Sequence, residues 1–397
     1  MAFAAALSVA SETERAIDEV CSRSLDSLGH RPDLALLFFS PHHAGAAESI
    51  LRTVQKRVGA GCLLGCPGEA IVGNNREIEG QPAVSLWLAQ FPQGVRLDPF
   101  HLEMEKTAEG YSLVGWPDHL ADVKPDRSAV LLLGDPFSLP VDAILRQLDE
   151  SHPGLRVMGG MASGVDKPGA CCLLLGDRVL HRGAVGVLLD GPIRIQTIVS
   201  QGCRPIGRHM VITRGKDNII TALGGKPPLA QLQEMWEGLS PEDRSLCQEG
   251  LHLGRVIDEY QDTFQRGDFL VRNVMGVDPD SGALAINDAI RVGQTVQFHV
   301  RDAQSAREDL RALLQTAANS GDTRPGGGLL FTCNGRGTRL FSEAHHDARA
   351  VSTQFGDLPL AGFFAQGELG PVGGQNFIHG FTVSVVLFED LATAQVH

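Results

Sequence analysis

Short apolar runs alternate with amphipathic stretches over the first 90 residues of the chain. Residues 34–39 (LALLFF) form an apolar run typical of a buried strand, and residues 45–58 repeat apolar positions at helical spacing. Two further apolar runs, separated by a segment rich in Gly and Asn, predict two closing strands. With a strand and a helix ahead of residue 30, the predicted order is strand, helix, strand, helix, strand, strand.

The same order returns near the end of the chain. Residues 296–301 and 329–333 have the composition of strands, and each is followed by sequence compatible with a helix. A third, weaker copy lies at residues 129–190. We therefore expect an α/β fold of repeated βαβαββ units with mixed sheets, packed as two associated halves, because such units cannot close their own cores.

Breaker residues cluster at 224–228 (GGKPP), which predicts the boundary between the halves. The expected domains are residues 1–225, with units at about 2–91 and 96–190, and residues 226–392.

Net charge restricts the possible partners. The 397 residues carry a formal charge of −13, which argues against nucleic acid or an anionic membrane surface, since both require a basic footprint. No segment approaches the roughly 18 apolar residues that span a bilayer. No Lys or Arg precedes the apolar start, so a secretory signal is not expected. These features favour a cytoplasmic location.

Familiar catalytic and metal-binding motifs are absent from the sequence. It contains no HExxH, GxxxxGKS/T or GxSxG pattern, and its eight cysteines include no CxxC pair. The adjacent histidines of His42-His43 and His345-His346 are poorly placed to bind one metal ion together, because neighbouring residues of a helix point about 100° apart. We predict neither a bound metal nor another cofactor.

The most suggestive polar segment follows the strand at residues 329–333. Its loop contains Cys333, Asn334, Gly335 and Arg336, at a strand–loop–helix junction with the helix expected from about residue 342. Ligands collect beyond the carboxyl ends of strands in open α/β sheets, where loop side chains and backbone amides converge. The alternative is a glycine-rich turn with a solvated Arg and a structural Cys.

Three more residues extend this candidate ligand site. Arg301, at the preceding strand–helix junction, could hold a carboxylate through two hydrogen bonds. Gly367 and Glu368 follow another strand, and the Gly68-Glu69 dipeptide suggests an equivalent position in the first unit. We expect Arg301, Asn334 and Arg336 to contact a ligand carboxylate or carbonyl, and Glu368 an amine; Glu368 could instead be a solvated turn carboxylate.

The chain resembles the FIST family over nearly its whole length. Four segments suggest the C-terminal FIST domain. They are the hairpin-like run with its Asp-Ser-Gly turn (residues 269–282), the strand before Asp302 (296–302), the FTCNGR loop (331–336) and the segment that leads to Glu368 (359–368). The N-terminal FIST domain is suggested by residues 34–87, 159–164 and 183–187.

This resemblance implies a sensory module of intracellular signal transduction that binds a small ligand, with an amino acid or related metabolite as the favoured candidate. It carries no catalytic residue over to this chain. A separate signalling protein would then be the partner. Two other functions stay open: an enzyme of amide or acyl chemistry that uses Cys333, and an interaction scaffold without a pocket.

Overall fold

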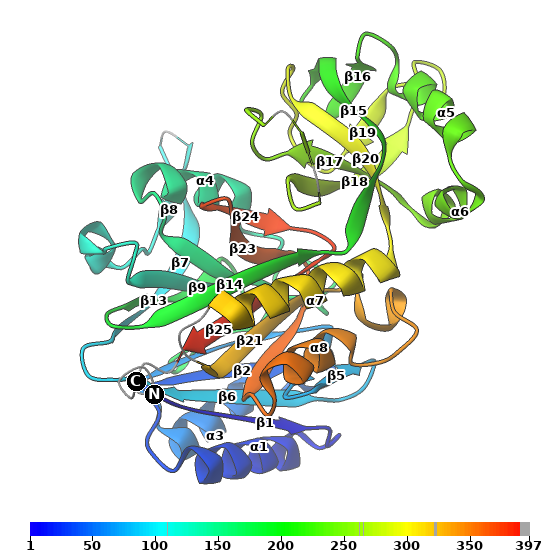
Figure 1. Ribbon diagram of the computed structural model, residues 1–397. Coiled ribbons are helices and arrows are strands. Elements are labelled where there is room, and N and C mark those ends of the chain that lie inside the picture. Colours follow the sequence, from blue (N-terminus) through cyan, green and yellow to red (C-terminus); the bar gives the residue numbers. More distant parts are fainter. Residues whose placement is uncertain (109, 262, 265, 321–323, 390–397) are drawn as a thin grey trace. The chain divides into compact units, whose positions relative to one another are not determined.

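The computed structural model describes residues 1–108, 110–261, 263–264, 266–320 and 324–389. It confirms the α/β class, with repeated units and mixed sheets. The chain forms two compact units (Figure 1). Within the described residues, the first comprises residues 1–199, 310–378 and 382–389, and the second comprises residues 200–309 and 379–381. The last three residues of the predicted 226–392 domain lie outside the described part of the chain.

The first unit contains three copies of one topology. Each copy supplies four strands to its own sheet, in the order first, last, second, third. The second and third strands of every copy are parallel, since their connection is a helical crossover. The strands are β1 (Ala2–Ser8), β6 (Val84–Gln90), β2 (Leu34–Phe39) and β3 (Cys62–Pro67); β7 (Arg96–Thr107), β13 (Ala184–Asp190), β9 (Ser128–Gly134) and β10 (Arg156–Met161); and β14 (Arg194–Gln201), β25 (Thr382–Glu389), β21 (Pro325–Cys333) and β22 (Leu360–Ala365).

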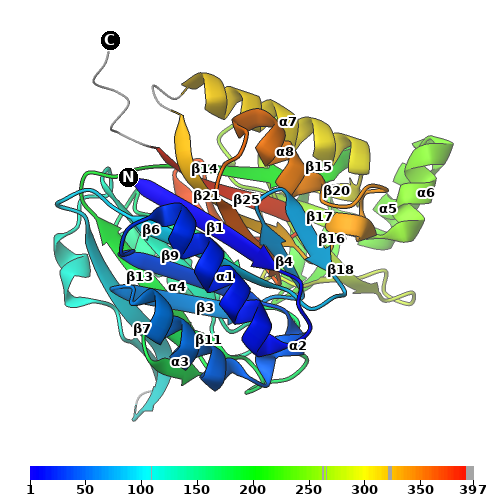
Figure 2. The same ribbon diagram turned by 90° about the horizontal axis from the view of Figure 1, so that it is seen from below.

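Helices cover the outer faces of these sheets. Buried side chains of α1 and α3 pack on the sheet of the first copy. Figure 2 shows these two helices beside the strands of that sheet. Residues of α7 and α8 pack on the sheet of the third copy. The helices are α1 (Thr13–Leu28), α2 (Pro41–Ala44) and α3 (Ala47–Val58) in the first copy, α4 (Val141–Ser151) in the second, and α7 (Ala303–Ser320) and α8 (His346–Phe355) in the third.

Each copy also donates a hairpin to the sheet of another copy, which the βαβαββ pattern missed. The hairpin β4–β5 pairs with β22, β11–β12 pairs with β3, and β23–β24 pairs with β10. These strands are short, and they pair with strands of another sheet. The sequence therefore contains no long alternation of apolar and polar residues that would predict them. They are β4 (Ala70–Gly73), β5 (Arg76–Glu79), β11 (Leu173–Leu175), β12 (Arg178–Leu180), β23 (Glu368–Val372) and β24 (Gln375–His379).

The register corrects the equivalence of Glu69 and Glu368. Ile71 lies opposite Phe363, the fourth residue of β22, and Leu369 lies opposite Gly159, the fourth residue of β10. Glu368 therefore corresponds to Ala70, and Glu69 is one position earlier. A shift of one residue turns a strand side chain to the opposite face. Accordingly, the Glu69 side chain is 38% exposed and Glu368 is fully buried.

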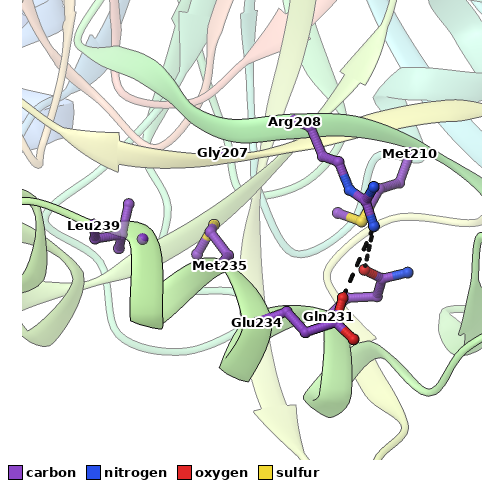
Figure 3. A pocket seen from close by; sticks show the side chains of 8 residues that line it. Gly207, Arg208, Met210, Gln231, Glu234, Met235 and Leu239 are labelled. Carbon is purple, nitrogen blue, oxygen red and sulfur yellow. Dashed lines mark hydrogen bonds and ion pairs between the residues drawn. The ribbon is translucent and has the colours of Figure 1, made fainter.

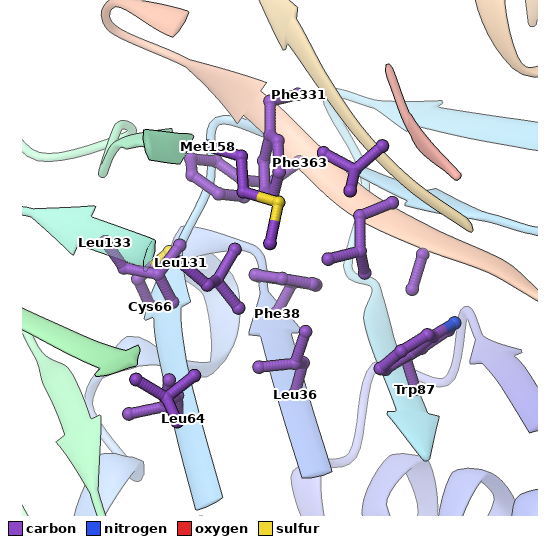
Figure 4. Packing of buried hydrophobic residues seen from close by; sticks show 14 of the residues in the cluster. Leu36, Phe38, Leu64, Cys66, Trp87, Leu131, Leu133, Met158, Phe331 and Phe363 are labelled. Carbon is purple, nitrogen blue, oxygen red and sulfur yellow. The ribbon is translucent and has the colours of Figure 1, made fainter. Parts of the chain in front are cut away.

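The central core of the first unit is built by all three copies. Figure 4 shows Phe38, Leu131 and Phe363, one from each copy, packed within one cluster. Phe38 and Phe363 have ring centroids 5.2 Å apart. Burial of such large apolar side chains is the main favourable contribution to folding, so the three copies depend on one another for stability.

The second unit is a closed antiparallel barrel with two helices. Its strands follow the order β15-β16-β19-β18-β17-β20 around the barrel, and apolar residues such as Leu253 and Phe298 fill its interior. The predicted division at 225/226 falls inside this unit, between β16 and α5. The elements are β15 (Cys203–Lys216), β16 (Ile219–Leu223), α5 (Pro228–Gly238), α6 (Pro241–Glu249), β17 (Leu251–Val256), β18 (Phe269–Val277), β19 (Leu284–Ile286) and β20 (Thr295–Arg301).

Two small features complete the fold. The second copy also has the short strand β8 (Gly110–Val114), paired with β7, and the 3₁₀ turn at Asp118–Asp122. Among the described residues, no helix is long and apolar enough to cross a membrane.

Candidate functional site

A buried polar cluster lies where β21 and β22 end. Cys333 is the last residue of β21, and the loop that follows turns Arg336 into the interior, where its side chain has no exposed surface. The helix after this loop begins at His346 rather than at residue 342, after a 3₁₀ turn at Gly337–Arg339. A charged side chain is buried at this depth only when it is paired.

Asp347 is the partner of Arg336. Its carboxylate oxygens accept hydrogen bonds from Nε and Nη2 of Arg336, each at 2.7 Å. The Thr332 hydroxyl donates to Asp347 at 2.7 Å, and His346 Nδ1 lies 2.9 Å from it. Burial alone would raise the pKa of Asp347, but the charge and hydrogen bonds of Arg336 outweigh it and hold this pKa below its ordinary value. Asp347 is therefore ionised.

An aromatic side chain closes one side of this ion pair. The Phe341 ring stacks on His346 with a centroid distance of 3.5 Å and an interplanar angle of 10°. The Arg336 guanidinium carbon lies 5.2 Å from the Phe341 centroid, within the range of a cation–π contact. Arg336 is thus held in one orientation, and its Nη1 has no hydrogen-bond partner.

Glu368 lies near Arg336 and is also fully buried. Its Oε2 accepts hydrogen bonds from the hydroxyl of Thr382 at 2.8 Å and from the Thr382 backbone N–H at 3.3 Å. Burial raises the pKa of Glu368 to about 8, and Thr382, the Arg336 charge and a hydrogen bond with the Cys333 thiol only partly oppose this. Glu368 is therefore mostly protonated at neutral pH, and its Oε1 has no geometrically acceptable partner.

A second buried carboxyl group, Glu77, comes from the hairpin donated by the first copy. Its Oε1 accepts a hydrogen bond from the backbone N–H of Ala348 at 2.8 Å, in the first turn of α8. Burial and the like charge of Asp347 raise the pKa of Glu77. Residues 271 positions apart in the chain therefore meet at this cluster.

The structure brings some of the predicted residues together. Cys333, Arg336 and Glu368 interact within the cluster. Asn334 and Gly335 are half-buried beside it, and the buried Oδ1 of Asn334 has no partner. Gly367 has a φ of 129°, and a Cβ there would lie 2.6 Å from the Ile378 side chain, so only glycine fits.

Arg301 lies on β20, in the second unit. There its guanidinium carbon lies 5.4 Å from the ring centroid of Phe381.

Glu77, Asp347 and Thr382 were missed by the sequence analysis. Asp347 lies in a predicted helix with nothing to mark it as an Arg partner. Glu77 lies in the hairpin that the sequence pattern did not show. One signal was available for Thr382. It begins an apolar closing strand, and because β25 runs antiparallel to β21, the start of β25 lies beside the end of β21, where Cys333 was found.

Two hollows of the described structure lie elsewhere. One, of about 460 Å³, is in the second unit between β15 and α5 (Figure 3). The other, of about 330 Å³, lies in the first unit near Asn74 and Asp357. Within the described residues, no group of three or more His, Cys, Asp and Glu side chains could hold a metal ion. Arg336 and Glu368 of the strand-end cluster have no exposed surface, so a ligand there would have to be small.

Comparison with known proteins defines the class to which this fold belongs. Residues 33–226 match the FIST N domain and residues 229–371 match the FIST C domain. The chain therefore belongs to the FIST family, whose domains are sensory domains of signal transduction proteins.

Individual relatives are similar over almost their full length. The chain is 41% identical over 394 residues to the uncharacterized protein Rv0628c of Mycobacterium tuberculosis strain H37Rv, covering 98% of this chain and 100% of that protein. It is 42% identical over 381 residues to the uncharacterized protein Mb0898c of Mycobacterium bovis, covering 96% of each.

Proposed function

We propose that this protein is a cytoplasmic sensor that binds a small amino acid or a related zwitterion at the strand-end cluster. The observation that carries the proposal is the set of unpartnered polar atoms there: Nη1 of Arg336, Oε1 of Glu368 and Oδ1 of Asn334. Unpaired buried polar groups cost about 1–3 kcal/mol each, so a ligand that pairs with them gains affinity.

The chemistry of these atoms fits opposite ends of one zwitterion. Arg336 Nη1 is a charged donor suited to a carboxylate, and Asp347 already fixes its direction. Glu368 Oε1 and Asn334 Oδ1 are acceptors suited to an ammonium group. An ammonium beside Glu368 would favour the ionised carboxylate, so binding at neutral pH releases a proton.

The output of such a sensor requires a partner. We propose a separate signalling protein in this role.

Thermal shift across an amino-acid panel tests the proposal. A ligand at 100 times its Kd should add about 2.7 kcal/mol of stability. Glu368→Gln and Asn334→Ala should lose the response. Glu389→Gln should keep it, because Glu389 is a buried carboxyl group at the opposite end of β25. A wild-type protein that responds to no member of the panel would count against the proposal.

A second candidate function is cysteine-dependent amide or acyl chemistry at Cys333. The Glu368 carboxyl group forms a hydrogen bond with this thiol, and the Gly335 N–H points at Sγ from 3.4 Å. Labelling with iodoacetamide at several pH values distinguishes this function from the ligand-binding function. A Cys333 thiol that titrates well below 8.5 supports the enzyme, whereas one that is inaccessible or titrates near 8.5 argues against it.

A further inference from the structure

The hollow in the second unit has features of a binding site that are independent of the strand-end cluster. Its volume of about 460 Å³ lies within the roughly 300–1,000 Å³ typical of small-molecule pockets. Two elements form its walls (Figure 3). The lining residues are Gly207, Arg208 and Met210 of β15, and Gln231, Glu234, Met235, Gly238 and Leu239 of α5 and its end.

An irregularity in β15 opens this space. Ile206 pairs with Phe298 of β20, but the next paired residue is Met210, opposite Val296. Three residues of β15 therefore stand against one of β20, and a bulge of this kind bends the strand out of the ladder. The side-chain amide of Gln297 holds the bulge by donating to the Gly207 carbonyl at 2.9 Å.

One part of the lining is apolar and adaptable. Met210 and Met235 line it together with Leu239. Methionine side chains are flexible and polarizable, and they make favourable contacts with aromatic rings. This lining suits an apolar or aromatic body.

One positive charge at the mouth is available to a ligand. The Arg208 side chain is 70% exposed, and its Nη2 donates to the neutral Gln231 Oε1 at 3.2 Å. Its nearest acidic contact, Glu234 Oε2, is 3.9 Å away. Lys226 makes a closer ion pair with Oε1 of the same Glu234. Two cations and one carboxylate therefore meet at this mouth, although the whole chain carries a charge of −13.

We propose that this hollow binds a small organic carboxylate with an apolar body. The carboxylate pairs with the Arg208 guanidinium, whose fork geometry matches it. The body packs against Met210, Met235 and Leu239. The second unit thus contains a ligand site of its own, with a preference for apolar acids that the zwitterion site of the first unit does not share.

Isothermal titration calorimetry of the whole chain with 3-phenylpropionate tests this site. We expect saturable binding to the wild type and at least tenfold weaker binding of the neutral amide, 3-phenylpropionamide. Arg208→Gln should also weaken binding of the acid at least tenfold. Arg214→Gln is the matched control, since Arg214 is exposed on the same strand but does not line the hollow.

A second variant adds a large side chain at a position that lines the hollow. A Cβ at Gly238 would meet no heavy atom within 4 Å, and leucine is a better helix former than glycine. Gly238→Leu should therefore keep the melting temperature and abolish binding. The proposal is overturned if 3-phenylpropionate shows no saturable binding to the wild type, or if Arg208→Gln and Gly238→Leu bind it as the wild type does. Neither variant should change the response to amino acids, so this test is separate from that of the strand-end cluster.

Discussion

Arg336 and Asp347 define the strand-end cluster at the scale of single residues. Their side chains are 0% and 1% exposed, and two hydrogen bonds of 2.7 Å join them. Desolvating both charges is costly, so the pair adds little net stability, but removal of one partner leaves an isolated buried charge. The role of the pair is therefore to fix the direction of Arg336.

Asp347→Asn should destabilise the protein by about 3–5 kcal/mol, because it leaves the Arg336 charge uncompensated. The control is Glu69→Gln, which breaks the exposed ion pair between Arg339 and Glu69, with side chains 57% and 38% exposed. That change should cost at most about 1 kcal/mol. Urea denaturation measures both; equal losses would show that Arg336 does not depend on Asp347.

Glu368 gives the protein a pH-dependent stability. Its folded-state pKa of about 8 lies above the ordinary 4.5, so the folded protein keeps a proton that the unfolded chain releases. The resulting stabilisation is present below pH 4.5 and is lost as the pH rises to 8. The unfolding free energy of the wild type, relative to that of Glu368→Gln, should fall by about 1.4 kcal/mol per pH unit between these values. A difference that does not change with pH would rule out a protonated Glu368.

Exchange of hairpins is the main feature at the scale of secondary-structure elements. The pairing of β4 with β22 joins residues 71 and 363, which are far apart in the chain. The sequence pattern predicted the copies, and it predicted the strands that end at Cys333 and shortly before Glu368, because apolar periodicity reports local structure. It could not reveal the exchanged hairpins or the Glu77 and Asp347 contacts, because these depend on which sheet a short strand joins.

Ile71→Ala tests the exchange. Ile71 is fully buried in the central core, and its truncation should cost about 2–5 kcal/mol. Because β4 is a strand of the third copy's sheet, the change should speed amide hydrogen exchange in β22 as well as in β4. Val9→Ala, at an exposed apolar position, is the control. Faster exchange confined to β4 and β5 would mean that the hairpin is an independent appendage.

Paired strands also place two histidines together in the barrel. His252 on β17 lies directly opposite His299 on β20. Burial lowers the pKa of each to about 4, and the charge of Arg301 adds to the effect on His252. The stabilisation from these neutral rings is complete above pH 6.5 and is lost as the pH falls towards 4. NMR titration should find both rings neutral at pH 5.5; a midpoint near 6.5 for either would contradict this.

The whole molecule combines a three-copy unit and a barrel, each with a candidate binding region of different chemistry. In the first unit the region is polar and compact, and the available atoms suit a zwitterion. In the second it is a hollow with an apolar interior and a cation at its mouth. A FIST family protein with this arrangement would respond to small metabolites, which accords with the sensory role of its domains.

Calorimetric titration of the wild type and Glu368→Gln with an amino-acid panel, at pH 7 in phosphate and in Tris, tests the central claim most directly. These buffers differ in ionisation enthalpy, so the difference between the two heats counts the protons released. We expect saturable binding of at least one amino acid to the wild type, with proton release from Glu368, and at least tenfold weaker binding to Glu368→Gln without that release. Absence of binding by any amino acid, or equal binding by the two proteins, would contradict it.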